Sequence, residues 1–211
     1  GHLAFGLLEF KLGGGEGGIN VADVEYLQAV RELCDAKGVL LIIDEIQSGF
    51  CRTGKMFAID HFGIEPDMMT VAKGIGGGFP LGAVLCSDKI NIGPGQHGST
   101  YGGNPLAAAA GLAAITYMVE NYLADQAKEK GDYFADEIRK LNLEKVREVR
   151  NLGLMVGVEI KEKVQPYLVE MMNKGVLLMP AGKTVLRFLP PAVIEKEDLD
   201  VVVQKLKEVL S

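Results

Sequence analysis

The sequence predicts an α/β protein: a mostly parallel sheet with helices on both faces, followed by a smaller α+β domain. Two segments, Val39–Ile43 and Met68–Ala72, are continuously apolar without alternation, as in strands that are buried on both faces. Helical segments separate the predicted strands, and this order is typical of parallel sheets. From Asn104 onward an alanine-rich helical segment and then short strands replace that order. We therefore expect the architecture to change there.

The first half of the chain contains the strands of the predicted parallel sheet. Leu3–Leu12 is expected to form the first strand and to end in a glycine-rich run. A helix is expected from near Asn20 to Gly38. Its apolar face is expected to consist of Leu27, Val30, Leu33 and Cys34. The further elements expected in this half are the strand Val39–Ile43, a helix around Met56–Phe62 and the strands Met68–Ala72 and Gly82–Cys86.

The second half predicts two helices and then an α+β domain. The expected helices are Pro105–Tyr117, Ala124–Leu141, Val164–Asn173 and Lys196–Leu210. The expected strands are Val146–Val149, Leu154–Ile160, Val176–Met179 and Val185–Leu189. The resulting division is a partial large domain over residues 1–103, connecting helices over 104–141 and a small α+β domain over 142–211.

Composition limits the classes of partner. The formal net charge of the 211 residues is -6, and the basic residues form no stripe, which argues against nucleic-acid binding. No apolar run is long enough to span a bilayer, so no membrane partner is expected. Cys34, Cys51 and Cys86 are widely spaced, which argues against a disulfide framework and a zinc site. We expect no metal, and a reducing, cytoplasmic location.

Lys73 is the first candidate for catalysis. It follows an apolar strand and precedes four glycines within residues 74–78. Desolvation at such a position lowers the pKa of an amine and makes it nucleophilic, although a solvated surface lysine is the ordinary alternative. A phosphate-binding loop would place its glycines before the lysine, and these glycines do not open a convincing helix, so P-loop and dinucleotide sites are disfavoured. We interpret the glycines as room for a bulky group on Lys73.

Asp44 and Arg187 are charged residues in apolar surroundings. Asp44 ends a buried strand, where an ionised carboxylate needs a cationic partner. An arginine, a helix N-terminus or the protonated nitrogen of a pyridine cofactor could be that partner. Arg187 precedes two prolines and suits a planar carboxylate, with a structural salt bridge as the alternative. Arg52 and Glu45 are interpreted as structural.

Five segments carry a family resemblance when they are taken together. They are Asp44–Phe50, Arg52–Lys55, Thr70–Gly82, His97–Pro105 and Leu186–Pro191. In this order they resemble the class III aminotransferases, and most closely the acetylornithine or acetyl-lysine type. The resemblance implies part of the large domain of the fold type I pyridoxal-phosphate transferases plus a small C-terminal domain.

The resemblance also implies the cofactor, pyridoxal 5'-phosphate (PLP), and the residues that bind it. Lys73 would form the Schiff base and move the proton during catalysis. Asp44 would keep the ring nitrogen protonated, and Gln47 would lie near the phenolic oxygen. Thr100 would bind the phosphate, and in this family it does so from the neighbouring subunit of a homodimer.

On the same grounds Arg187 would bind the substrate carboxylate, and Glu16 would pair with Arg187 until substrate arrives. The implied reaction moves the terminal amino group of acetylornithine, or of a related blocked diamino acid, to 2-oxoglutarate. The partners would thus be small amino acids and 2-oxo acids.

The chain also departs from the family. Members are about twice as long, and the N-terminal half, with further phosphate and ring contacts, has no counterpart here. Where the family tends to carry a glutamine, the segment Glu9–Gly18 has extra glycines. A second hypothesis is therefore a non-catalytic folded fragment or assembly partner, which we expect to associate through unpaired sheet edges.

Overall fold

The computed structural model describes residues 6–8 and 18–211, with side chains from Gly18 onward, and contains two compact units. The first unit comprises Ala22–Phe50 and Phe57–Tyr122 together with the first strand. The second comprises residues 18–21 and 51–56 and the chain from Leu123 to Ser211. The chain is mixed α/β, as predicted. The three-part division at residues 103 and 141 stays a prediction.

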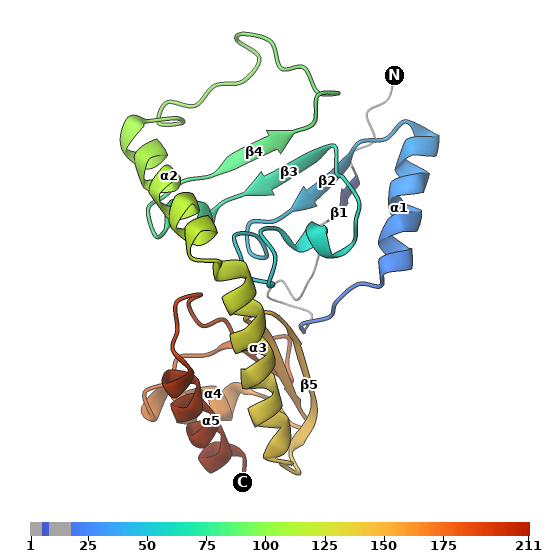
Figure 1. Ribbon diagram of the computed structural model, residues 1–211. Helices are drawn as coiled ribbons and strands as arrows, with labels where there is room; N and C mark the ends of the chain where they lie inside the picture. The colour runs from blue at the N-terminus through green and yellow to red at the C-terminus, as the bar shows by residue number, and fades with distance from the viewer. Residues whose placement is uncertain (1–5, 9–17) are drawn as a thin grey trace. The chain divides into compact units, whose positions relative to one another are not determined.

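The first unit is built on a four-stranded sheet (Figure 1). Its strands are β1 (Gly6–Leu8), β2 (Leu41–Asp44), β3 (Met68–Val71) and β4 (Ala83–Cys86), paired in that order. The β1–β2 and β2–β3 pairs are parallel and the β3–β4 pair is antiparallel, so the described sheet is mostly parallel. β2 is fully apolar up to Asp44 and buried, which explains its lack of alternation.

Helix α1 (Val24–Lys37) ends at Gly38, whose φ of 64° is the left-handed conformation of a helix C-cap. The helix begins later than the predicted start near Asn20. The predicted apolar face was also partly wrong, because Leu27 is buried whereas Leu33 is 58% exposed. Six residues at 3.6 residues per turn place these two side chains on different faces.

The first unit contains two short 3-10 turns that the sequence did not predict. Residues Ala58–His61 form a single turn, η1, where a helix over Met56–Phe62 was expected. Residues Lys73–Gly76 form a second turn, η2, among the glycines that were not expected to open a helix. Helix α2 (Pro105–Glu120) follows, and its N-cap Asn104 accepts a hydrogen bond from the Ala107 amide at 2.9 Å.

Asp67 joins the segments of the first unit around β2. Its Oδ2 accepts hydrogen bonds from the Leu41 amide at 2.8 Å and Arg31 Nη1 at 2.9 Å, and its Oδ1 from Lys89 Nζ at 3.3 Å. Burial alone would raise the pKa of Asp67, but these hydrogen bonds outweigh it and hold the pKa below its ordinary value. The carboxylate therefore connects α1, β2 and the segment after β4.

The second unit packs helices against an antiparallel sheet of order β5-β6-β8-β7. Its elements are α3 (Leu123–Lys140), β5 (Val146–Leu152), β6 (Met155–Ile160), α4 (Gln165–Asn173), β7 (Met179–Ala181), β8 (Val185–Phe188) and α5 (Lys196–Leu210). β7 begins where the predicted strand Val176–Met179 was to end. Phe134 of α3 and Phe188 of β8 meet edge to face in the core, with ring centroids 5.4 Å apart.

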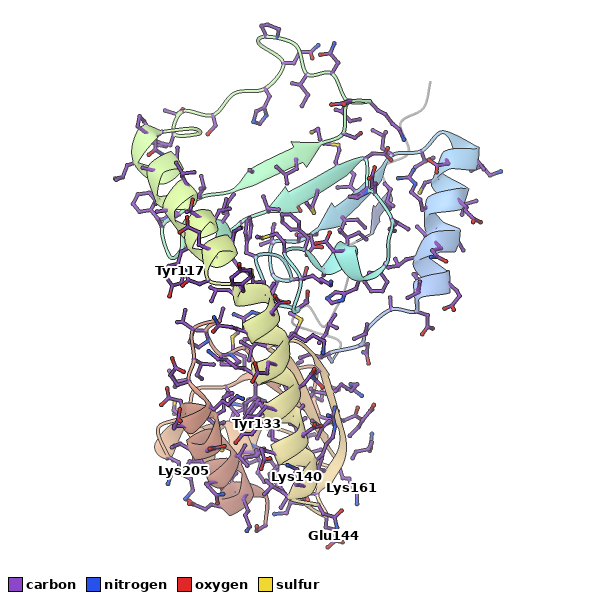
Figure 2. All side chains as sticks on the ribbon, viewed as in Figure 1. Tyr117, Tyr133, Lys140, Glu144, Lys161 and Lys205 are labelled. Atoms are coloured by element: carbon purple, nitrogen blue, oxygen red, sulfur yellow. The ribbon has the colours of Figure 1, made fainter. Side chains whose placement is uncertain are left out.

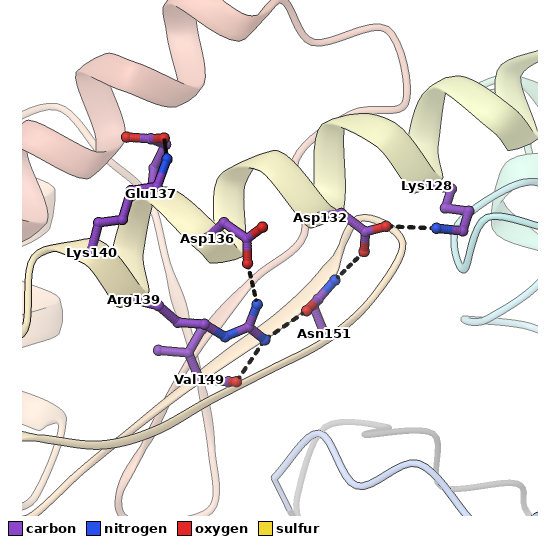
Figure 3. Close-up of polar contacts among 8 residues, drawn as sticks. All are labelled: Lys128, Asp132, Asp136, Glu137, Arg139, Lys140, Val149 and Asn151. Carbon is purple, nitrogen blue, oxygen red and sulfur yellow. Dashed lines mark hydrogen bonds and ion pairs between the residues drawn. The ribbon is translucent and has the colours of Figure 1, made fainter.

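Polar contacts hold α3 to β5 at the surface of this unit (Figure 3). Arg139 Nη2 donates to the Val149 carbonyl at 2.9 Å and to Asn151 Oδ1 at 3.0 Å. Asn151 Nδ2 in turn donates to Asp132 Oδ1 at 2.9 Å. Tyr133 of α3 is labelled in Figure 2. Its hydroxyl donates to Asp200 Oδ1 of α5 at 2.6 Å, and this hydrogen bond raises the pKa of Tyr133 to about 12.

No single helix within residues 18–211 is long and apolar enough to cross a membrane, although α2 and α3 pass that test as a bent pair.

We expect Asp67→Asn to lower the free energy of unfolding by about 1–3 kcal/mol at neutral pH, because a buried charged acceptor of three donors is lost. The folded-state pKa of Asp67 lies below its unfolded value, so wild type should lose this contribution as the pH falls through the folded-state pKa, and the variant should not. Urea unfolding between about pH 3 and pH 7 measures this. Exposed Asp88→Asn is the control, and equal acid sensitivity of the two variants would contradict the prediction.

A second prediction concerns Gly131 of α3. A methyl group there would overlap the backbone carbonyl of Gly153, because the helix and the β5–β6 turn touch through backbone atoms. Gly131→Ala should destabilise the second unit by at least the 1–3 kcal/mol that is roughly typical of overpacking. Thermal unfolding and hydrogen exchange in β5 and β6 measure the loss. Gly98→Ala, where no atom lies within 4 Å, should leave stability unchanged.

Candidate active site

The carboxyl ends of β2 and β3 meet at one edge of the sheet, because the two strands are adjacent and parallel. Asp44 is the last residue of β2 and is paired in register with Thr70 of β3. Asp44 Oδ1 accepts hydrogen bonds from Thr70 Oγ1 at 3.0 Å and from the Ile46 amide at 2.9 Å. Lys73 follows β3 at the same edge. The structure thus brings Asp44 and Lys73 to one edge, as expected from strand order.

Asp44 has no cationic partner among residues 18–211. Its described hydrogen bonds both go to Oδ1, and it belongs to no ion pair in this part of the chain. Thr70 and the backbone fix the carboxylate, and Oδ2 is left for a further donor. A protonated ring nitrogen is a donor of the kind that a partly buried carboxylate needs.

Lys73 has a φ of 51°, in the left-handed region that a residue other than glycine enters at a cost of roughly 1–2 kcal/mol. Strain of this kind is concentrated at functional positions. The side chain is exposed, so the expected desolvation of the amine is wrong for the described chain. Position and backbone conformation, rather than burial, distinguish this lysine.

The glycines after Lys73 are explained mainly by packing and backbone conformation. A Cβ on Gly74 would lie 2.8 Å from the Cβ of Phe50, so Phe50 occupies that space. Gly77 and Gly78 have φ values of 58° and 107°, which favour glycine. The interpretation of the glycines as open space next to Lys73 is therefore corrected, except at Gly78, where a Cβ would meet no atom within 4 Å.

Gln47 lies in the turn that follows Asp44. Its Oε1 is buried and has no hydrogen-bond partner among the described residues. An unpaired buried amide atom costs about 1–3 kcal/mol, so a ligand group that satisfied this amide would bind favourably. Because Oε1 is an acceptor, a donor group of a ligand, such as a phenolic hydroxyl, could satisfy it, and Gln47 follows Asp44 by three residues.

No hydrogen bond joins Thr100 to this edge in the part of the chain that the structure describes. Thr100 is exposed in the segment between β4 and α2, and within residues 18–211 it has no hydrogen bond to Asp44, Gln47 or Lys73. Glu16 lies outside the described residues.

Arg187 occupies the second unit, on β8 between Gly157 of β6 and Met179 of β7. The residue is 4% exposed, and Nη2 donates to Met179 Sδ at 3.6 Å. Nε and Nη1 have no partner among the described residues, and desolvation lowers the pKa of the guanidinium. Arg187 lines a cavity of about 440 Å³ whose other walls include Val176, Leu178, Phe188, Ile194 and Val202. A buried guanidinium in such a cavity can bind a carboxylate.

Arg52 is structural, as interpreted from the sequence. Its Nη1 donates to the carbonyls of Leu154 at 3.1 Å and Pro190 at 2.5 Å, all within the second unit.

Thr70 was not predicted as a site residue from the sequence. The sequence contained a signal for it, because Thr70 is the one polar residue near the end of the predicted strand Met68–Ala72, which is parallel to the strand that ends in Asp44. No cluster of three or more potential metal ligands occurs in the part of the chain that the structure describes.

Comparison with known proteins identifies related chains. The profile of the family described as aminotransferase class-III matches residues 13–210. The LysW-aminoadipate semialdehyde transaminase of Deinococcus radiodurans is 52% identical over 200 residues, covering 93% of this chain and 47% of the relative. The acetylornithine aminotransferase of Methanocaldococcus jannaschii is 48% identical over 202 residues, covering 93% and 50%. The chain thus spans about half the length of these curated relatives.

A solved aminotransferase structure is also similar to this chain. An ornithine aminotransferase from Toxoplasma gondii, whose structure shows partial occupancy of PLP at its active site, is 34% identical with a TM-score of 0.82. The match covers 92% of this chain and 48% of that one.

Proposed function

We propose that this chain, which belongs to the class III aminotransferases, carries part of a PLP site for amino-group transfer. Members of the family depend on PLP and act on amino acids and oxo acids. The observation that carries the proposal is the sheet edge from which fixed Asp44, strained Lys73 and Gln47 with its unpaired Oε1 follow.

Each residue of this edge has a role that its environment supports. Asp44 would receive the ring N–H at Oδ2, while Thr70 holds Oδ1. Gln47 would contact the phenolic oxygen. The Lys73 amine would hold the cofactor until the substrate amine takes its place, and the amine released in this way would carry the proton to and from the substrate carbon. PLP, when bound, supplies the electron sink for the pair left on that carbon.

Arg187 would bind the substrate carboxylate, because its guanidinium is buried without an anion among the described residues. Glu16 would pair with it when no substrate is bound. The proposed donor is acetylornithine or a related blocked diamino acid and the proposed acceptor is 2-oxoglutarate. The names of the two curated relatives support this class of donor.

A homodimer is proposed, with Thr100 binding the phosphate of the partner's cofactor. The exposure of Thr100 supports this role. Leu106 and Leu112 on α2 are 65% and 70% exposed, and exposed apolar side chains of this size favour contact with another polypeptide. The free thiols of Cys34, Cys51 and Cys86 support a cytoplasmic location.

The alternative, a folded assembly partner without catalysis, is favoured by the exposed leucines of α2, which suit contact with another polypeptide. Cofactor binding separates the two hypotheses.

We expect the purified chain, incubated with PLP, to develop an absorbance band that borohydride removes and that Lys73→Ala abolishes, because the attachment requires the Lys73 amine. Mass spectrometry after borohydride should place the cofactor on Lys73. Lys37→Ala, an exposed lysine of α1, should behave as wild type. A wild-type chain without the band would favour the assembly-partner hypothesis.

Arg187→Met should weaken 2-oxoglutarate binding by roughly 10- to 100-fold, the value of a charge-assisted hydrogen-bond pair. In a chain that also carries Glu16→Gln, so that no carboxylate at position 16 can pair with Arg187, it should leave the melting temperature unchanged or raise it, because a buried guanidinium without an anionic partner is removed. Calorimetric titration and thermal unfolding measure the two effects. Exposed Lys183→Met is the control, and strong destabilisation by Arg187→Met would indicate a structural role instead.

A further inference from the structure

Glu45 is a fully buried carboxylate that the proposed chemistry does not use. It is 0% exposed and follows Asp44. Its Oε1 accepts a hydrogen bond from the Ile59 amide at 2.8 Å, and its Oε2 accepts one from Ser48 Oγ at 2.5 Å. Burial raises the pKa of Glu45, and these hydrogen bonds oppose that rise. The side chain thus joins the turn after β2 to the 3-10 turn η1.

The backbone of the same residue closes the turn that carries Gln47. The Glu45 amide donates to the Thr70 carbonyl at 2.9 Å, and the Glu45 carbonyl accepts from the Gly49 amide at 3.0 Å. A Cβ on Gly49 would lie 2.8 Å from that carbonyl oxygen, so the turn is tightly closed. Gln47 lies between the two ends of this closed turn.

The far end of the turn is fixed as well. Phe50 packs against Gly74, next to Lys73, at a distance that excludes any side chain there. The Gln47 turn is therefore held to β3 by Glu45 and against the Lys73 segment by Phe50. The Glu45 carboxylate also reaches a third segment at Ile59, and the Phe50 ring meets the same segment edge to face at Phe57, with ring centroids 5.5 Å apart.

We propose that Glu45 is a positioning residue that, through Ser48 and Ile59, holds the Gln47 amide in the orientation in which it meets a ligand. This inference rests on the proposed function in that the ligand is taken to be PLP. A side chain at position 45 must accept from Ile59 and interact with the Ser48 hydroxyl at the same time. A glutamine can do both, because its NH₂ group can donate to the hydroxyl oxygen. A leucine can do neither.

The first experiment needs no cofactor. The side-chain amide of Gln47 is observed by NMR in the full chain labelled with ¹⁵N-glutamine, and Gln47→Ala assigns its signal. We expect Glu45→Leu to speed the exchange of the Gln47 side-chain NH₂ protons with water roughly five- to tenfold. This factor corresponds to the loss of one hydrogen bond from the turn that carries Gln47. Glu45→Gln should restore slow exchange, and Glu65→Leu, at an exposed glutamate, should change nothing. Unchanged exchange in Glu45→Leu overturns the proposal.

If circular dichroism shows that Glu45→Leu does not fold, Ser48→Ala decides the question. It removes one hydrogen bond to Glu45 and leaves the Ile59 contact, so exchange at Gln47 should still accelerate. Unchanged exchange in folded Ser48→Ala overturns the proposal.

The second experiment is a double-mutant cycle on PLP affinity with Glu45→Leu, Gln47→Ala and the double variant. A positioning role predicts that Glu45→Leu weakens binding in the wild-type background and has no effect when Gln47 is already alanine. Equal losses in both backgrounds would indicate a merely structural role and overturn the proposal. If the wild-type chain binds no PLP, the proposed function fails, while the exchange experiment still decides the role of Glu45.

Discussion

The parallel, in-register pairing of β2 with β3 is the constraint on which the candidate site depends. It sets Asp44 opposite Thr70, so that the hydroxyl of one strand fixes the carboxylate of the other. It also makes the Gln47 turn and the Lys73 segment leave the sheet at the same edge, where Phe50 packs on Gly74. A slip of one residue would turn Asp44 to the opposite face of the sheet and separate it from Thr70.

Buried polar groups divide into two kinds in this chain. Asp67 and Glu45 accept hydrogen bonds from several segments, and their cost of burial is thereby offset. Gln47 and Arg187 retain buried polar atoms without partners among the described residues. The first kind holds segments together. The second kind favours a ligand, since binding would supply the missing hydrogen bonds.

The strained backbone of Lys73 and the close packing next to it together orient this residue. The left-handed backbone at Lys73 is stable only because neighbouring segments hold it, among them the Phe50 side chain against Gly74. The amine itself remains exposed. Within the first unit, packing thus orients the backbone of the candidate nucleophile while its side chain stays accessible to a cofactor.

The sequence by itself determined the α/β class, the positions of Asp44 and Lys73 at strand ends and the family, because apolar runs and short motifs are local features. It did not reveal which face of α1 is buried, as Leu33 shows, nor that η1 is a single turn, because packing against other segments decides both.

Contacts between residues far apart in the chain were equally hidden. The tertiary structure alone decided that Phe50 fills the space at Gly74, that Ile59 and Ser48 share the Glu45 carboxylate, and that Arg187 is buried without an anion among the described residues. Each of these three findings depends on which segments of the chain contact one another. Burial and hydrogen bonding change the free energy of a charged or polar side chain only once those segments are in contact.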